Sequence, residues 1–182
     1  MEKNSKKITH IVIDADIVLS SLLREEGYTQ AVLSILLCNE DLNVIAPSEI
    51  INQIERHLHE ISKRSRLPFK IVRDSLRRIL ENIKPVEEKE FRDEIARSLL
   101  YVKHREDAPL AGSALKYSPS IILTYNKKHF ISEKLGKEGV KVFTPGELME
   151  YFNLELKTAK KLKRRRGLLS IMSSLLVRKK GK

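Results

Sequence analysis

The sequence has little of what crosslinks a protein covalently or through a metal. Cys38 is the single cysteine among 182 residues, which excludes an intramolecular disulfide and a zinc cluster built from thiolates. Of the five histidines, His57 and His59 are the closest pair, and side chains two positions apart on a helix point in different directions. We therefore expect neither a disulfide nor a histidine metal pair.

Long apolar runs are missing as well. No run approaches the roughly 18 apolar residues of a membrane span, and the first ten residues, MEKNSKKITH, lack the apolar segment of a signal peptide. These absences predict a cytoplasmic, intracellular protein without a transmembrane segment. Hydrophobic residues make up 41% of the chain, enough to bury one ordinary core, so we expect one domain with an appendage.

Positive charge is in excess, and it is concentrated at one end of the chain. Of the 35 Lys or Arg residues, eleven lie in residues 153–182 against Glu155 alone, a net charge of +10. The other 152 residues contain 24 basic and 23 acidic side chains. Such asymmetry is typical of an extension that binds a polyanion. We therefore predict a domain over residues 1–152 and a basic extension over residues 153–182.

Two carboxylates lie where an apolar strand is predicted to pass into a helix. Residues 11–13 are apolar and β-branched, as in a strand buried on both faces, and apolar residues recur at helical spacing over residues 18–23. Asp14 and Asp16 therefore follow the carboxyl end of a strand, where open α/β sheets bind ligands. One Asp suffices to cap the helix, which leaves the other for a cation.

Apolar spacing predicts helices along much of the remaining chain. Residues 48–58 are predicted to form one helix with Ser48 as its N-cap. Residues 87–101 are predicted to form another, with Leu99 and Leu100 on its apolar face. Two further helices are predicted over residues 29–38 and 69–83.

Helix-capping signals mark the second half of the chain. Asp107 precedes Pro109 at a helix start, and the small residues that follow permit close packing against a neighbouring element. Thr144 and Glu147 are the outer members of a capping box. Further strands are predicted over residues 43–46, 120–124 and 141–143.

This alternation predicts a three-layer α/β/α domain with a mostly parallel central sheet, followed by a basic helical tail. Parallel strands place their carboxyl ends at one edge of the sheet. Asp14 and Asp16 after the first strand, Asp107 at a helix start and Asn126 after an inner strand are therefore expected to converge.

Five segments in succession resemble the PIN domain, the nuclease fold shared by VapC-type toxins and many RNA-processing enzymes. They are IVIDADIVLSSLL, APSEIINQIERHLHEI, EDAPLAGSAL, IILTYNKKHF and VKVFTPGELMEYF, in the family's order, and the resemblance covers about residues 8–152. The resemblance implies a hydrolase in which acidic side chains bind Mg²⁺ or Mn²⁺. The ions activate water for cleavage of a phosphodiester.

The resemblance also assigns site residues. Asp14 corresponds to the family's first acid and Asp107 to its third, whereas Gln53 and Asn126 stand at the positions of a Glu and the final Asp. Asp16 restores one negative charge. The implied metal ligands are Asp14, Asp16 and Asp107, with Gln53 and Asn126 completing the catalytic set. Because affinity depends on the number of carboxylates, we expect weak binding of a single ion.

The basic extension also has an apolar stripe, so it is predicted to form an amphipathic helix. A solvated terminus, a membrane-surface helix and a nucleic-acid anchor all fit this pattern, and the PIN-like body favours RNA. The predicted RNA-binding residues are Lys127, Lys128, Lys160, Lys161, Lys163, Arg164, Arg165, Arg166, Arg178, Lys179 and Lys180.

Two functions remain open on the sequence. The first is a metal-dependent endoribonuclease whose tail anchors RNA. The second is a catalytically weakened or inactive PIN-fold component that binds RNA or belongs to a ribonucleoprotein, which the two amides favour. A toxin paired with an antitoxin, or a homodimer, is compatible with either function.

Overall fold

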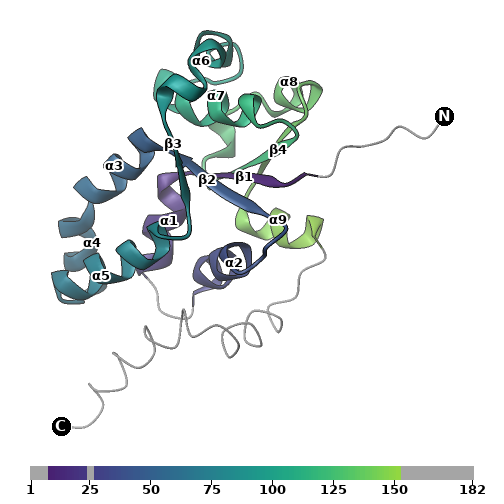
Figure 1. Ribbon diagram of the computed structural model, residues 1–182. Coiled ribbons are helices and arrows are strands. Elements are labelled where there is room, and N and C mark those ends of the chain that lie inside the picture. Colours follow the sequence, from purple (N-terminus) through teal and green to yellow (C-terminus); the bar gives the residue numbers. More distant parts are fainter. Residues whose placement is uncertain (1–7, 24–26, 153–182) are drawn as a thin grey trace, which may run out of the picture.

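The computed structural model describes residues 8–23 and 27–152, and its centre is a parallel sheet. In these residues five strands pair in the order β3-β2-β1-β4-β5, and every neighbouring pair is parallel (Figure 1). The strands are β1 (His10–Ile13), β2 (Asn43–Pro47), β3 (Lys84–Val86), β4 (Ser120–Leu123) and β5 (Val140–Phe143). The predicted α/β class is confirmed, and the sheet is wholly rather than mostly parallel.

After their first residues, which are polar, the central strands are apolar because helices cover both faces of the sheet. Ile11, Val12 and Ile13 of β1 are completely buried, and all four residues of β4 are buried. Ile11 pairs in register with Val44 of β2 on one side and with β4 on the other. A continuous apolar run of this kind is what a strand between two helical layers requires.

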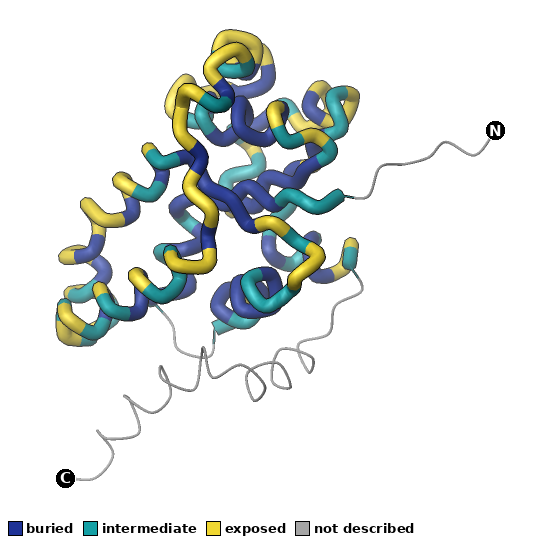
Figure 2. The backbone as a smooth tube through the Cα atoms, viewed as in Figure 1, coloured by how far each residue is buried: buried dark blue, intermediate teal, exposed yellow. Residues whose placement is uncertain are grey.

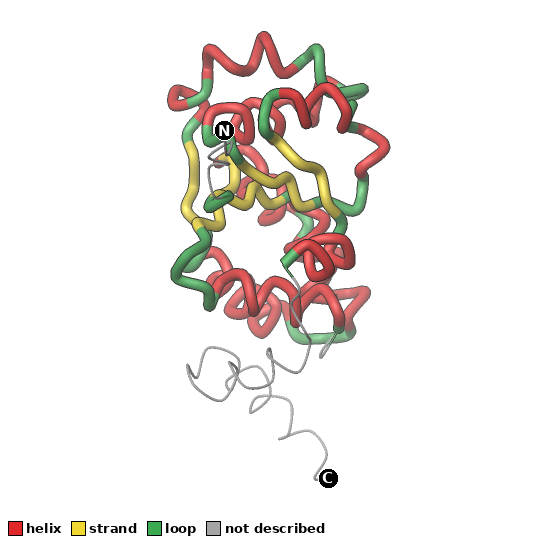
Figure 3. The backbone as a smooth tube through the Cα atoms, turned by 90° about the vertical axis from the view of Figure 1, so that its right-hand side faces the viewer, coloured by secondary structure: helices red, strands yellow, loops and turns green. Residues whose placement is uncertain are grey.

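Helices form a layer on each side of the sheet (Figure 3). On one side α7 packs on β1, β2 and β4, and α6 packs on α7; on the other side α1 packs against α2, α3, α4 and α5. Figure 2 shows the buried sheet and the exposed outer faces of α3, α4 and α5. The helices are α1 (Ala15–Leu23), α2 (Tyr28–Leu37), α3 (Ser48–Arg56), α4 (Leu58–Ser65), α5 (Phe69–Leu80), α6 (Arg92–Ser98), α7 (Ala108–Lys116), α8 (Ser132–Lys137) and α9 (Pro145–Tyr151).

The predicted helix over residues 48–58 is two helices in the structure. The chain turns at His57, so α3 ends at Arg56 and α4 begins at Leu58. The predicted cap is also wrong, because Ser48 is the first helical residue and its side chain caps nothing. The Ser48 hydroxyl instead donates to Glu87 Oε1 at 2.7 Å, which ties α3 to the segment after β3.

The predicted helix over residues 87–101 is shorter, and the strand before it was missed. Only Arg92–Ser98 form the α-helix α6, and Leu99 and Leu100 are 43% and 64% exposed rather than inward. Pro85, which lies between the two helices predicted over residues 69–83 and 87–101, is part of β3. A proline is tolerated there because β3 is at the edge of the sheet, where one side of the strand has no ladder to complete.

Small residues let α7 approach α6 closely, as predicted. A Cβ built on Gly112 would lie 3.2 Å from Cδ2 of Phe91, a side chain that is 1% exposed. The same Cβ would lie 3.6 Å from the backbone of Ile95 in α6. Gly112 therefore sets the distance between the two helices on this side of the sheet.

Replacing Gly112 by valine should lower the free energy of unfolding by about 1–3 kcal/mol, the usual cost of adding methyl groups to a packed core. Gly136→Ala is the control, since a Cβ in α8 would meet nothing within 4 Å. That change should leave stability unchanged or raise it by up to about 1 kcal/mol through helix propensity. Equal denaturant midpoints for Gly112→Val and the parent would contradict a close approach of α7 to Phe91 and α6 at Gly112.

Candidate functional site

The strand order creates a switch point between β1 and β4. From β1 the chain moves outward to β2 and β3, and then returns to β4 and β5 on the opposite side of β1. In open α/β sheets, ligands bind outside the carboxyl ends of the strands at such a point. Asp14 follows β1 directly and Thr124 follows β4 directly, so both stand at the switch point.

Asp14 is the innermost acid of the group. It is 9% exposed, its backbone N–H donates to Leu123 O at 3.1 Å, and its Oδ2 accepts from the Thr124 hydroxyl at 2.7 Å. Burial raises the pKa of Asp14, the Thr124 hydrogen bond opposes that rise, and the charge of Asp107 adds to it. Asp107 is therefore within electrostatic reach of Asp14, although 93 positions separate them in the sequence.

Asp16 is held by the loop after β4. Its Oδ2 accepts from the backbone N–H of Tyr125 at 3.0 Å and from Asn126 Nδ2 at 3.1 Å. Burial, followed by the charge of Asp14, raises the pKa of Asp16 to about 7. The amide of Asn126 thus acts as a hydrogen-bond donor to Asp16, at the position where the resemblance placed a carboxylate.

Asp107 lies just before α7 and contacts a histidine that the sequence reasoning did not select. Its side chain does not cap the helix. Its Oδ2 lies 3.2 Å from Nδ1 of His129, an ion pair when the imidazole is protonated, and the His104 ring packs edge-on against His129 at 4.5 Å between centroids. Burial raises the pKa of Asp107, while His129 and His104 act in the opposite direction.

Donor chemistry suits a hard cation at these three side chains, which we call the carboxylate site (Asp14, Asp16 and Asp107). Among the described residues, Asp16 Oδ1 is a buried oxygen without a hydrogen-bond partner, and the buried Asp107 Oδ2 faces His129 Nδ1 at 3.2 Å. A buried acceptor such as Asp16 Oδ1 favours a positive ion. Within residues 8–23 and 27–152, however, no three His, Cys, Asp or Glu side chains are arranged as a ready ligand set. The three side chains would therefore have to move toward one another to ligate a common ion.

Other predicted residues have different surroundings. Gln53 is exposed on α3 and makes no hydrogen bond to a described residue. Lys127 Nζ lies 2.5 Å from Glu147 Oε1, so its charge is already paired, whereas Lys128 is exposed. The predicted RNA-binding residues of the tail, from Lys160 to Lys180, lie outside the described residues.

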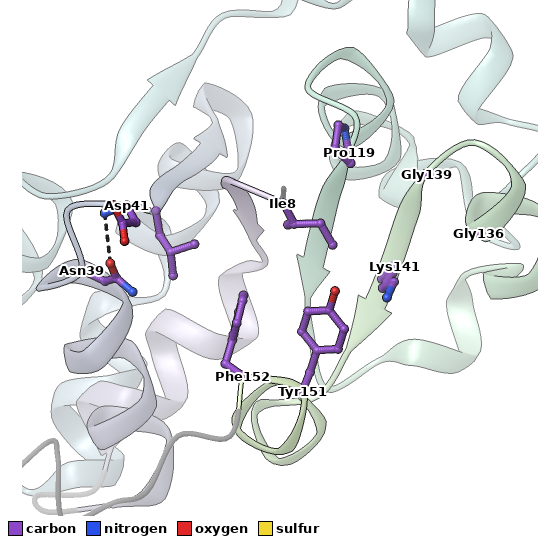
Figure 4. A pocket seen from close by; sticks show the side chains of 10 residues that line it. Ile8, Asn39, Asp41, Pro119, Gly136, Gly139, Lys141, Tyr151 and Phe152 are labelled. Atoms are coloured by element: carbon purple, nitrogen blue, oxygen red, sulfur yellow. Dashed lines mark hydrogen bonds between the residues drawn. The ribbon is translucent and has the colours of Figure 1, made fainter. Parts of the chain in front are cut away.

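A cavity of about 840 Å³ lies at the opposite edge of the sheet (Figure 4). Ile8 just before β1, Pro119 just before β4 and Gly139 just before β5 line it, so it opens at the amino ends of the strands. Tyr151 and Phe152 at the end of α9 complete its wall. This cavity is thus separate from the carboxylate site.

The fold is an open parallel α/β domain with acidic side chains at its switch point, and comparison with known families identifies its class. Residues 12–159 match the PIN domain, so the chain belongs to the PIN domain family. No curated protein matches the chain. Membership indicates nuclease-type activity on nucleic acid, and PIN domain nucleases generally use divalent metals. No helix in the described ranges is long and apolar enough to cross a membrane.

Asp16→Asn should stabilise the protein at pH 8 and leave it unchanged near pH 4. An acid whose pKa is raised on folding destabilises the folded state as pH climbs from the unfolded pKa of 3.8 to the folded value of about 7. One pKa unit corresponds to about 1.4 kcal/mol, so we expect a gain of about 1–2 kcal/mol at pH 8 after allowing for partial exposure of the side chain.

Denaturant unfolding from pH 4 to pH 8 measures this effect. Asparagine keeps an oxygen that can accept from Tyr125 and Asn126, so the variant removes charge and little else. Asp93→Asn, at an exposed position in α6, is the control, and its free energy of unfolding should change with pH as that of the parent does. Parallel curves for the parent and Asp16→Asn would show that Asp16 ionises freely in the folded protein.

Proposed function

We propose that the protein is a metal-dependent endoribonuclease. The observation that carries the proposal is that Asp14 and Asp16 lie together at the switch point within electrostatic reach of Asp107, and that the buried Asp16 Oδ1 lacks a hydrogen-bond partner among the described residues. Burial disfavours the ionised form of the three acids, which lowers the stability of the folded protein. A bound cation stabilises the ionised form and offsets this loss. RNA as the substrate is supported by the likeness to RNA-processing members of the family and by the basic extension.

In this proposal Asp14, Asp16 and Asp107 hold one Mg²⁺ or Mn²⁺. The ion, when bound, lowers the pKa of a bound water and offsets charge on the phosphodiester. Thr124 has a positioning role, because its hydroxyl donates to Asp14 Oδ2 and lies 3.4 Å from Asp16 Oδ2. Asn126 fixes the same hydroxyl, since its backbone N–H donates to Thr124 Oγ1 at 2.9 Å.

A second candidate is a PIN-fold protein that binds RNA without cleaving it efficiently. It is favoured by Asn126, whose amide donates to Asp16 instead of supplying a charge, and by the exposed Gln53. With fewer carboxylates, a cation binds more weakly. Cleavage measured against binding separates the two candidates.

Asp14→Asn should abolish Mn²⁺-dependent cleavage of a labelled single-stranded RNA, with a loss of at least about 100-fold, because the innermost ligand loses its charge. RNA binding measured by fluorescence anisotropy should remain. Cleavage at the parent rate by the purified variant would place the activity elsewhere in the protein or in a contaminant.

Asn126→Asp should raise Mn²⁺ affinity by about tenfold, since it adds a fourth carboxylate to the site. Without metal the same change should lower stability at pH 8 by about 1 kcal/mol, because the new charge faces Asp16 Oδ2. Asn52→Asp adds an equal charge at an exposed position of α3, and it should change neither the Mn²⁺ affinity nor the stability at pH 8. Calorimetric titration with Mn²⁺ measures the affinity, and equal values for both variants would rule out a role for position 126 in ion binding.

The basic extension, residues 153–182, is proposed to anchor RNA through its phosphates. Replacing Lys163, Arg164, Arg165 and Arg166 by glutamine should then reduce the slope of log affinity against log salt by up to about 3, at about 0.7 per phosphate contact on single strands. Leu168→Gln keeps the charge and should keep the slope. An unchanged slope in the fourfold variant would indicate that the extension serves another partner, such as an anionic membrane.

A further inference from the structure

Two short basic segments lie side by side next to the carboxylate site. Residues 103–105 read Lys-His-Arg and residues 127–129 read Lys-Lys-His. The backbone N–H of Lys103 donates to His129 O at 2.7 Å, and the N–H of Ile131 donates to Tyr101 O at 2.7 Å. An antiparallel bridge between Val102 and Phe130 joins the same two segments. Six residues that are far apart in the sequence therefore form one local surface.

This surface is attached to the carboxylate site at two points. His129 in the second segment lies 3.2 Å from Asp107 Oδ2, and Asn126, directly before that segment, donates to Asp16. His104 packs against the His129 ring, which fixes the first segment to the second. The two segments that carry this surface therefore adjoin the acids.

The basic side chains of the surface differ in their availability. Lys127 is paired with Glu147, which forms the capping box of α9 with Thr144, so this lysine fastens the loop after β4 to α9. Lys103, Arg105 and Lys128 are exposed and form no ion pair with any residue of the described ranges. We call these three residues the basic rim (Lys103, Arg105 and Lys128).

We propose that the basic rim binds successive phosphates of single-stranded RNA and thereby sets where the strand crosses the carboxylate site. This inference rests on the proposed function, since it names how the same site holds its substrate. A cluster of buried acids repels a polyanion, and cations beside it supply the attraction that brings a phosphodiester within reach. Arginine and lysine bind phosphate oxygens through charge-assisted hydrogen bonds.

A flexible single strand fits this surface better than a duplex. The rim lies on a loop and two single 3-10 turns, Arg105–Asp107 and Lys127–His129, and residues 101–105 and 127–131 form neither an α-helix nor a β-ribbon that could enter a groove. Proteins that bind single strands without sequence preference follow the backbone with positive charge. The basic rim therefore binds RNA of any sequence, and it positions the strand through contacts with the phosphate backbone.

The test uses the full chain with Asp14→Asn, so that RNA is bound and not cut. The rim variant carries Lys103→Gln, Arg105→Gln and Lys128→Gln. Anisotropy with a labelled 12-nucleotide RNA, measured across a series of KCl concentrations, should give a slope of log affinity against log salt smaller by about 2, at about 0.7 per lost contact. Affinity near 100 mM KCl should fall by about 100-fold, because the change in slope is counted from about 1 M salt.

Two controls match the charge change and the position. Replacing Lys63, Lys70 and Lys89 by glutamine removes three exposed positive charges elsewhere and should leave the slope close to the parent value. Lys127→Gln changes the neighbour of a rim residue, and it should reduce thermal stability while keeping the slope, because Lys127 is paired with Glu147. Lys128→Gln alone should reduce the slope by about 0.7 and keep the stability.

Each outcome is decisive. An unchanged slope in the rim variant, or no binding of RNA by the parent at any salt concentration, overturns the proposal. If the triple variant fails to fold, the comparison of Lys128→Gln with Lys127→Gln decides it instead. Cleavage is measured separately with Asp14 intact. A reduced slope in the rim variant without cleavage by the parent supports the basic rim and refutes the nuclease. Cleavage by the parent with an unchanged slope in the rim variant supports the nuclease and refutes the basic rim.

Discussion

The pairing of β1 with β4 is the constraint on which the site depends. His10 pairs with Ser120 at the start of the two strands and Ile13 pairs with Leu123 at their end, so both strands end at the same position in the sheet. The ladder continues one residue further, where the N–H of Asp14 donates to Leu123 O. The Asp14 carboxylate, directly after β1, and the Thr124 hydroxyl, directly after β4, therefore meet. A shift of the strand pairing by one residue would turn the two side chains to opposite faces of the sheet.

Thr124 converts this strand pairing into a local network. Its hydroxyl donates to Asp14, accepts from the backbone N–H of Asn126, and lies beside Asp16. The side chain of Asn126 then returns to Asp16, which closes the group. Two acids from the end of β1 are thus restrained by three successive residues after β4. The network holds in place two carboxylates whose pKa values are raised by burial.

Elements with strong local signals were predictable, and elements defined by tertiary contacts were not. The apolar run of β1 and the capping box at Thr144 specify their structures locally, and both were predicted. β3 is three residues long and contains Pro85, and α8 buries only Leu135 among its residues, so neither has a periodic pattern. The pairing of Asp107 with His129 depends on the bridge between residues 102 and 130, which no local pattern encodes.

Asn126 has a consequence for the conditions in which the chain can fold. A carboxylate at this position would repel Asp16, and the folded state would then draw part of its stability from a bound cation. The amide replaces that repulsion with a hydrogen bond of 3.1 Å. Folding of the domain therefore needs no cation to offset a charge at position 126.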